Sequence, residues 1–232
     1  MEEENKYYDD LDYQKVEDSN EKKRKIRGVL KEVFEWVICI IIAYVLYLNI
    51  NYFIGAVSRV KLTSMYPTAA EGEMVVLQRP TIFNHTLERG EIVTFESPMD
   101  VKFYVDQQDN YPVAQYEVYT GITKFLHDFI GVGKVSYIKR VIAIPGDHIF
   151  ISEDGSVYIN DEKIEEDYIR EPFTAREGEY YDLIVPEGTV FVMGDNRADS
   201  RDSRYFGCVP ISKINGYVKC RIWPLNKIGG LD

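Results

Sequence analysis

Cysteine is scarce in this chain, with three residues among 232. Cys39 lies inside a long apolar stretch, so only Cys208 and Cys220 remain as candidates for a disulfide bond. Such a bond needs an oxidising compartment, and two cysteines twelve positions apart do not establish one. We therefore expect two free, buried thiols, and the pairing of Cys208 with Cys220 stays open.

Clustered metal ligands and excess positive charge are missing as well. There is no C-x-x-C motif, and the three histidines are scattered at His85, His127 and His148. A structural zinc site needs such ligands at close spacing, so we expect no metal, and no motif indicates an organic cofactor. The formal net charge of −11 argues against a nucleic-acid partner, because such proteins carry basic patches.

The chain has a single long apolar run, from Val33 to Val57. About 20 apolar residues suffice to cross a bilayer as a helix, so we predict one transmembrane anchor at residues 32–57. A cleaved signal peptide is the alternative, but it would have a shorter apolar core and a small-residue cleavage site.

The charges that flank this run predict its orientation. Only Arg59 and Lys61 follow it closely, whereas a cluster of cations precedes it: Lys22, Lys23, Arg24, Lys25, Arg27 and Lys31. Cytoplasmic flanks carry the excess of Lys and Arg, so the N-terminus should be cytoplasmic and residues 58–232 extracytoplasmic. The acidic first 20 residues carry few aliphatic side chains, which predicts a disordered tail within residues 1–31.

After residue 58 the pattern is that of a mainly β domain. Short runs rich in β-branched and aromatic residues alternate with Gly, Pro, Asn and Asp, as strands alternate with turns. The predicted strands are Met74–Leu77, Glu91–Phe95, Tyr137–Ile144, His148–Ile151, Val157–Ile159, Thr189–Met193 and Tyr217–Trp223. Asp154-Gly155 and Asn160-Asp161 predict hairpin turns. We expect one antiparallel β domain over residues 58–232.

Residues 97–136 fit this pattern less well. They are polar and rich in tyrosine, with one short amphipathic segment at 123–130 that predicts a helix. A segment of this length without clear strands is either functional or mobile, and both interpretations stay open. We treat it as an insertion between two strands.

Ser64 is the candidate nucleophile, in the sequence Ser64-Met65-Tyr66-Pro67-Thr68. Pro67 restricts Tyr66 to an extended conformation, which would hold the serine hydroxyl in a fixed place. A plain surface turn is the alternative, because Ser and Pro are common turn residues. A serine hydroxyl also needs an adjacent base, and none of the three histidines has a companion motif.

Lys139 is the better candidate for that base. It lies in a predicted strand in which alternation places Lys139 on one face and Arg140 on the other. The face that packs inward takes its cation with it, and burial lowers the pKa of a lysine so that it can accept a proton. The alternative is that Lys139 extends to water from a sheet edge.

A third polar segment, residues 194–207, is dense in Asp, Arg and Ser. Asp–Arg pairs can form two parallel hydrogen bonds and so make a rigid loop. Such a loop could support a serine and a lysine from below. A calcium loop is the alternative, but the glutamate that would end it is missing.

Together these segments resemble the type I signal peptidases, which are membrane-anchored Ser/Lys proteases. The motifs are Ser-Met-x-Pro-Thr at 64–68, Arg-Gly-Glu-Ile-Val at 89–93, Tyr-Ile-Lys-Arg-Val at 137–141 with Pro-Gly-Asp at 145–147, and Gly-Asp-Asn-Arg…Asp-Ser-Arg-Tyr-Phe-Gly at 194–207. Their order and spacing agree with the family over about residues 30–225. The resemblance implies a mostly antiparallel β catalytic domain behind a membrane anchor.

The resemblance also implies roles for individual residues. Ser64 would be the acylated nucleophile and Lys139 the general base. Ser200 would orient the lysine, while Asp202 and Arg204 would form a structural ion pair beneath the site with Asp195 in the same network. The backbone N–H of Ser64 would stabilise the oxyanion. Some members add a hydroxyl two positions earlier, but Leu62 stands there, so the second oxyanion donor stays unassigned.

The expected function is therefore a serine endopeptidase that cleaves signal peptides from exported preproteins at the outer face of the plasma membrane. Its partners would be signal peptides, the lipid bilayer and export machinery. A catalytically idle β module that binds peptides, a specialised peptidase for pilin-like substrates, and a self-cleaving repressor-type protease are the alternatives. The predicted anchor and the lack of a DNA-binding segment argue against the last of these.

Overall fold

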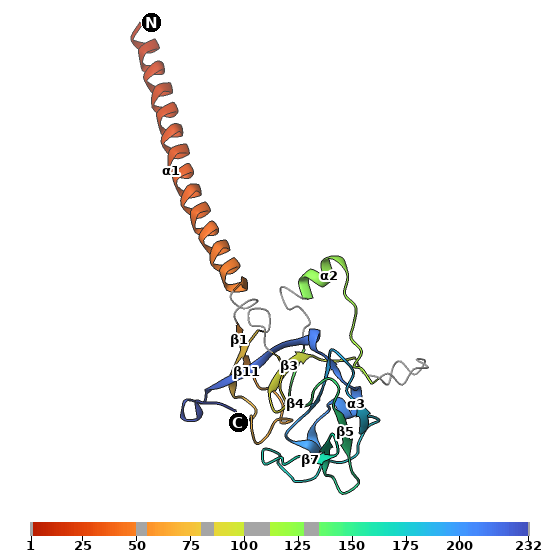
Figure 1. Cartoon of the computed structure of the whole chain (residues 1–232). Coiled ribbons are helices and arrows are strands. Elements are labelled where there is room, and N and C mark those ends of the chain that lie inside the picture. The colour runs from red at the N-terminus through yellow and green to blue at the C-terminus, as the bar shows by residue number, and fades with distance from the viewer. Residues whose placement is uncertain (1, 50–54, 80–85, 100–111, 128–134, 232) are drawn as a thin grey trace. The chain divides into compact units, whose positions relative to one another are not determined.

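The structure is a computed structural model that describes residues 2–49, 55–79, 86–99, 112–127 and 135–231 (Figure 1). In chain order its helices and strands are α1 (Glu2–Asn49), β1 (Gly55–Arg59), β2 (Met74–Gln78), β3 (Ile92–Glu96), α2 (Gly121–Phe125), β4 (Ser136–Ala143), β5 (His148–Ile151), β6 (Val157–Ile159), β7 (Glu162–Lys163), β8 (Asp182–Ile184), β9 (Thr189–Met193), α3 (Ser203–Phe206), β10 (Val209–Pro210) and β11 (Ile214–Trp223). The chain divides into two compact units, Met1–Asn49 and Ile50–Asp232.

The first unit is the single helix α1, so the disorder predicted for the tail is not found over residues 2–31. The physical reason is composition: α1 contains no proline and one glycine, Gly28, and it is rich in Glu and Lys. Glu and Lys have high helix propensity even though they are not hydrophobic.

The predicted anchor at residues 32–57 is not confirmed. Within the described part of the chain, no helix combines the length and the apolar character that crossing a membrane requires. The predicted segment also includes residues 50–54, which lie outside the described residues. Residues 55–57, which the prediction placed in the span, belong to strand β1 instead.

The second unit is built on a seven-stranded sheet in the order β1-β2-β11-β3-β4-β9-β10. Every pairing between named neighbours in this sheet is antiparallel, which confirms the predicted mainly β, antiparallel domain. The register is interrupted four times where β11 and β4 contain bulges or irregularities: between Ile214 and Gly216, between Val218 and Cys220, between Arg221 and Trp223, and between Val141 and Ala143. Bulges of this kind bend a strand and increase its twist.

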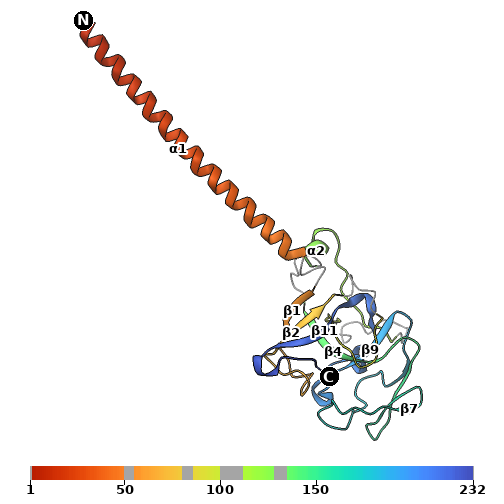
Figure 2. The same ribbon diagram turned by 60° about the vertical axis from the view of Figure 1, so that its left-hand side comes forward.

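A smaller sheet follows, in the order β7-β6-β5-β8, and lies toward the end of the domain away from β1 (Figure 2). The two hairpin turns predicted in it are confirmed. Gly155 has φ 80° between β5 and β6, while Asn160 and Asp161 have φ 52° and 69° between β6 and β7. Positive φ at these positions is what tight hairpin turns require.

The predicted strands are all present, and the structure adds β1, β7, β8 and β10 to them. The predicted helix at 123–130 is found in part, as α2, while residues 128–130 lie outside the described residues. Within the insertion, the backbone of Ala114 is bonded to that of Cys208, and Ser97 N donates to Val135 O at 2.8 Å. The two ends of the insertion are therefore bonded to each other, and Ala114 in its middle is bonded to the residue before β10.

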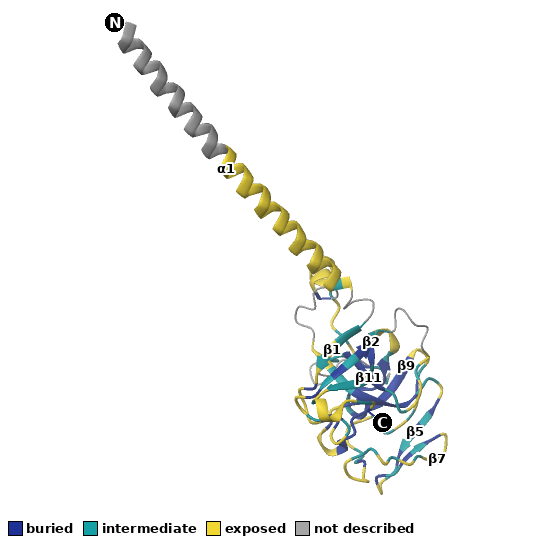
Figure 3. Ribbon diagram, turned by 90° about the vertical axis from the view of Figure 1, so that its left-hand side faces the viewer, coloured by how far each residue is buried: buried dark blue, intermediate teal, exposed yellow. Residues whose placement is uncertain are grey.

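Three apolar clusters form the core of the domain, and Figure 3 shows buried residues gathered within the sheet domain. Every residue of β9 is buried, as are four of the five residues of β3. One of them contains Met65, which is fully buried against Val75, Leu77 and Ile92. Full burial of a Met side chain is worth about 1.5–3 kcal/mol. Met65, the residue after Ser64, thus anchors this turn in the core.

Candidate active site

Ser64 and Lys139 lie in direct contact. Lys139 Nζ donates a hydrogen bond to Ser64 Oγ at 2.6 Å, across 75 positions of sequence. Only 6% of Ser64 and 3% of Lys139 is exposed. The two predicted residues are thus brought together with little of either side chain exposed.

Lys139 is buried because of its place in β4. This strand pairs with β3 along residues 136–140 but with β9 only from Arg140 onward, so Lys139 sits where the strand becomes central. The alternative that Lys139 extends to water is wrong. Burial lowers its pKa to about 8, against the opposing effect of the Asp202 and Asp195 carboxylates. With this pKa, about a tenth of the lysine is neutral at pH 7, far more than for a free lysine, whose pKa is about 10.4.

Ser64 lies in a tight turn that follows directly from β1. Tyr66 N donates to Thr63 O at 3.0 Å and Ala69 N donates to Met65 O at 2.8 Å. With Met65 buried in the core, these bonds fix the backbone on both sides of the serine. The interpretation of this segment as a plain surface turn is wrong, because Ser64 and Met65 are both buried.

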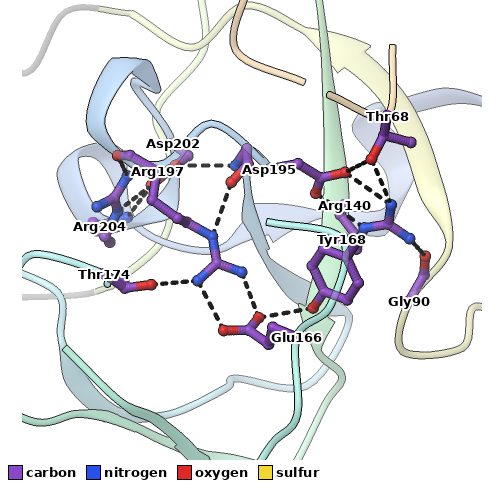
Figure 4. Close-up of polar contacts among 11 residues, drawn as sticks. Thr68, Gly90, Arg140, Glu166, Tyr168, Thr174, Asp195, Arg197, Asp202 and Arg204 are labelled. Atoms are coloured by element: carbon purple, nitrogen blue, oxygen red, sulfur yellow. Dashed lines mark hydrogen bonds and ion pairs between the residues drawn. The ribbon is translucent and has the colours of Figure 1, made fainter. Parts of the chain in front are cut away.

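Asp202 and Arg204 form the predicted ion pair, and both are fully buried (Figure 4). Arg204 Nε donates to Asp202 Oδ1 at 2.9 Å and Arg204 Nη2 to Asp202 Oδ2 at 3.0 Å. Burial alone would raise the pKa of Asp202, but the Arg204 guanidinium outweighs it and holds that pKa below its ordinary value. Asp202 Oδ2 also accepts from Gly194 N at 3.1 Å, which ties the pair to the loop beside Ser64.

Asp195, which the resemblance placed in the same network as the Asp202–Arg204 pair, forms an ion pair of its own with Arg140. Arg140 donates to both of its carboxylate oxygens, at 3.0 and 2.8 Å, and Thr68 Oγ1 donates to Oδ2 at 2.5 Å (Figure 4). Arg140 is thus buried on the opposite face of β4 from Lys139 with its charge paired. Through Asp195, Arg140 on β4 is connected to Thr68, at the end of the turn that begins at Ser64.

A third buried pair, Arg197 with Glu166, was missed by the sequence interpretation. Arg197 contacts both Glu166 oxygens and also donates to Gly194 O at 2.9 Å and to Thr174 Oγ1 at 2.5 Å. The OH of Tyr168 donates to Glu166 Oε1 at 2.7 Å. Arg197 stood in a recognised motif, but nothing in the sequence marked Glu166 as its partner.

Ser200 is buried beside Gly194, close enough to Asp202 for its hydroxyl to help lower the pKa of that carboxyl group. The bond to Lys139 that the resemblance implies is not among the described contacts.

The two described histidines, His127 and His148, each lie next to a carboxylate. His148 Nε2 lies 2.8 Å from Asp182 Oδ1 in the small sheet, and His127 Nε2 lies 3.5 Å from Glu96 Oε1. His85 is outside the described residues. Neither described histidine has a contact with Ser64 in the structure, so Lys139 is the base that the geometry offers.

Other possible functional groups can be placed as well. Cys39, Cys208 and Cys220 are free thiols; Cys208 is buried, whereas Cys220 is only partly so. In the described part of the chain, no three His, Cys, Asp or Glu side chains are grouped so that they could hold a metal ion. Leu62, at the position of the missing oxyanion hydroxyl, is 60% exposed.

A cleft of about 450 Å³ opens onto the dyad. Its lining residues are Ser58, Arg59, Val60, Lys61, Leu62, Ser64, Val75, Thr94, Val135, Ser136, Tyr137, Ile138 and Lys139. Strands β1 and β4 both contribute, although three strands separate them in the sheet order. The sheet must therefore curve so that these two strands face each other across the cleft.

Both walls of the cleft are open strand edges. β1 is the end strand of the sheet, and Val60 extends its ladder by bonding to Glu73 and Gly72. By alternation, the backbone groups of Arg59 and Lys61 then point away from β2. On the other wall, residues 136–139 of β4 pair with β3 but not with β9.

The sequence matches known proteins over most of its length. The profile of the family described as "Signal peptidase, peptidase S26" matches residues 33–223. Signal peptidase IB of Staphylococcus aureus is 29% identical over 212 residues, which cover 85% of this chain and 93% of the relative. A protein described as probable signal peptidase I-2 of Synechocystis is 30% identical over 187 residues, covering 81% of this chain and 72% of the relative.

Among solved structures, a signal peptidase I from Enterococcus faecalis is 25% identical. The match covers 57% of this chain and 97% of that chain, with a TM-score of 0.36, and the fold described above does not rest on it. The family match over residues 33–223 spans the serine turn, β4 and the 194–207 loop. The chain therefore belongs to the signal peptidase family, peptidase S26, and is by that membership a serine endopeptidase.

Proposed function

We propose that this protein removes signal peptides from exported preproteins, with Ser64 as the nucleophile and Lys139 as the general base. The observation that carries the proposal is the 2.6 Å contact between Lys139 Nζ and Ser64 Oγ. A nucleophile needs a base within hydrogen-bond reach, and this is the base within reach of Ser64. The pKa of Lys139, lowered by burial to about 8, supplies the neutral amine.

The first half of the reaction is acylation. Neutral Lys139 accepts the Ser64 proton while Ser64 Oγ attacks the scissile carbonyl carbon. The resulting oxyanion is stabilised by backbone N–H groups, of which Ser64 N–H is the one assigned. The carbon–nitrogen bond then breaks, and protonated Lys139 gives its proton to the leaving amine. The signal peptide is left esterified to Ser64.

The second half is deacylation by water. Lys139 is neutral again after protonating the amine, so it can take a proton from a water molecule. That water attacks the ester carbonyl, the ester bond to Ser64 Oγ breaks, and Lys139 returns the proton to Ser64. Ser200, which is buried beside Gly194, supports Lys139 from the loop side in this proposal.

The substrate lies extended in the cleft in this proposal. Residues 58–61 and 136–138 offer open backbone edges on opposite walls, with Ser64 and Lys139 beside them. An extended peptide can add to such edges through main-chain hydrogen bonds. Small side chains next to the cut, as the family resemblance implies, suit a cleft that also contains Val60, Val75 and Ile138.

We also propose that the protein acts at the outer face of the plasma membrane, with the lipid bilayer and export machinery as partners. The support is the apolar run Val33–Val57 with its preceding cluster of cations. Fifteen positions separate Asn49, where α1 ends, from Ser64, so the chain between them extends at most about 54 Å. Alkaline extraction of cell membranes tests this: release of the protein into the soluble fraction would contradict it.

The activity is tested by cleavage of one purified preprotein by the full chain in detergent. Ser64→Ala and Lys139→Ala should each abolish cleavage while leaving the thermal unfolding transition intact. Lys163→Ala, which removes an exposed lysine in β7, is the matched control and should cleave as the parent does.

The alternatives predict different results in the same assay. Full activity in Lys139→Ala, with His148→Ala inactive instead, would refute the Ser/Lys assignment. A parent protein that binds the preprotein but never cuts it would be a peptide-binding module. Cleavage confined to pilin-like preproteins, in a panel of several, would identify a specialised peptidase.

A further inference from the structure

The residue before the nucleophile, Thr63, is bonded to the 194–200 loop through both its side chain and its backbone. Asn196 Nδ2 donates to Thr63 O at 3.2 Å, and Thr63 Oγ1 donates to Asp199 Oδ2 at 2.5 Å. Next to these bonds, Asn196 N donates to Ser64 O at 3.0 Å. Two segments more than 130 positions apart are thus joined by three hydrogen bonds, two of them through side chains.

These bonds determine how one peptide plane is oriented. The Thr63–Ser64 peptide is not among the cis bonds of the described chain, so its C=O and N–H point in opposite directions. Thr63 O is held by Asn196 Nδ2 and by Tyr66 N. The direction of Ser64 N–H follows from that anchoring, since the six atoms of a peptide group move as one plane.

We propose that Asn196 and Asp199 are positioning residues that clamp the Thr63–Ser64 peptide, so that Ser64 N–H stays aimed at the developing oxyanion. The inference rests on the proposed function, in which Ser64 N–H is the assigned oxyanion donor. Asn196 is suited to the task because only 3% of it is exposed, so its amide is held in place by the surrounding loop. Asp199 holds the Thr63 side chain from the exposed side of the loop.

The clamp matters more in this chain because Leu62 has no side-chain donor. With no hydroxyl at that position, a larger share of the oxyanion stabilisation falls on a single backbone N–H. Loss of one oxyanion donor typically lowers turnover by about 10²–10³-fold. A donor that is present but poorly aligned should lower turnover by a smaller factor. Thr63 itself cannot replace the missing hydroxyl, because its Oγ1 is already bonded to Asp199.

The test measures kcat and KM separately for cleavage of a preprotein by the full chain in detergent. Thr63→Val, Asp199→Ala and Asn196→Ala should each lower kcat by about tenfold or more with KM nearly unchanged, since an oxyanion contact forms only in the transition state. Thr63→Ser and Asp199→Asn, which keep a donor and an acceptor, should restore most of that kcat. Thr123→Val removes an exposed threonine hydroxyl that bonds to Thr120 O and should behave as the parent.

A double-mutant cycle separates the clamp from general damage to the loop. If Thr63 and Asp199 act through their mutual bond, Thr63→Val combined with Asp199→Ala should be no slower than either single variant. Unchanged kcat in both single variants, a loss confined to KM, or fully additive losses would overturn the inference. Thr63→Val keeps the side-chain shape at an exposed position, so the test does not depend on the buried Asn196 variant folding.

Failure of the clamp differs from failure of the proposed function. Ser64→Ala and Lys139→Ala are measured beside these variants. If both are inactive while Thr63→Val and Asp199→Ala match the parent, the dyad stands and the clamp is refuted. If Ser64→Ala or Lys139→Ala still cleaves, the proposed function itself is refuted.

Discussion

Lys139 and Arg140 are neighbours on one strand, and both are buried, yet their environments differ. Arg140 keeps its charge because Asp195 accepts two hydrogen bonds from it. Within the described residues, no carboxylate accepts a hydrogen bond from Lys139. Its Nζ donates to the neutral hydroxyl of Ser64 instead. Burial without a paired anion disfavours the charged form, which is what a lysine base requires.

The pH dependence of cleavage follows from this environment. Lys139 must be neutral to accept the serine proton, so kcat/KM should rise with pH and be half-maximal near pH 8, where burial places its pKa. The peptide substrate should have no group that titrates between about pH 6 and 11, so that the pH–rate profile reports ionisation of the enzyme alone. An acid limb near 10.4, the pKa of a free lysine, would contradict a desolvated base.

The buried Asp202–Arg204 pair leads to a prediction about stability. Asp202→Asn removes one charge and leaves the fully buried Arg204 unpaired, which should lower the free energy of unfolding by about 3–5 kcal/mol. Glu153→Gln is the matched control, because it breaks the pair of the largely exposed Glu153 with Arg176 and should cost less than about 1 kcal/mol. Denaturant unfolding compares the two, and equal losses would contradict a special role for burial.

Single residues were predicted unevenly from the sequence. Ser64 and Lys139 could be predicted because motif order and spacing mark them, and alternation limited the faces of β4. That both faces of β4 are buried could not be predicted, because it depends on how the sheet curves. Glu166 could not be predicted as the partner of Arg197, since a lone acidic residue in a polar segment has no signature.

Among the elements, the loop after β9 brings the site together at Gly194. Its N–H donates to Asp202, its C=O accepts from Arg197, and the Ser64 carbonyl packs against its Cα. A side chain at this position would overlap Ser64 O and Ser200 Oγ and would lie 2.7 Å from Ser200 Cβ. Only glycine allows the loop to approach the nucleophile this closely.

Gly194→Ala should therefore damage catalysis more than stability. Displacing the serine turn by about 1 Å should lower kcat/KM by about 100-fold or more. Gly28→Ala in α1 is the control, since a Cβ there meets nothing within 4 Å. The measurement is kcat/KM of both variants on one peptide. A normal kcat/KM in Gly194→Ala would contradict the proposal that the loop must approach Ser64 this closely.

Elements were predictable where local pattern determines them. The longer strands and both hairpin turns follow from β-branched runs and from Gly, Asn and Asp at turn positions. β1 could not be predicted because its first residues continue the apolar run that predicts a membrane span. β7 and β10 are only two residues long, too short for a strand pattern. Their pairing depends on neighbouring strands rather than on their own sequence.

For the whole molecule, every residue of the site and cleft belongs to the unit Ile50–Asp232. The nucleophile follows β1, the base lies on β4, and the supporting loop follows β9, so the sheet order determines how they meet. Family membership states the reaction class, while the assignment of Ser64 and Lys139 to that reaction is the central claim to be tested.

The most direct test is to trap the acyl-enzyme. The full chain is mixed with a peptide ester that resembles the end of a signal peptide, quenched in acid within the first turnover, and analysed by mass spectrometry with peptide mapping. The account predicts an increase by the mass of the acyl group, located on Ser64 and absent in Ser64→Ala. Turnover without an adduct, or an adduct on another residue, would contradict it.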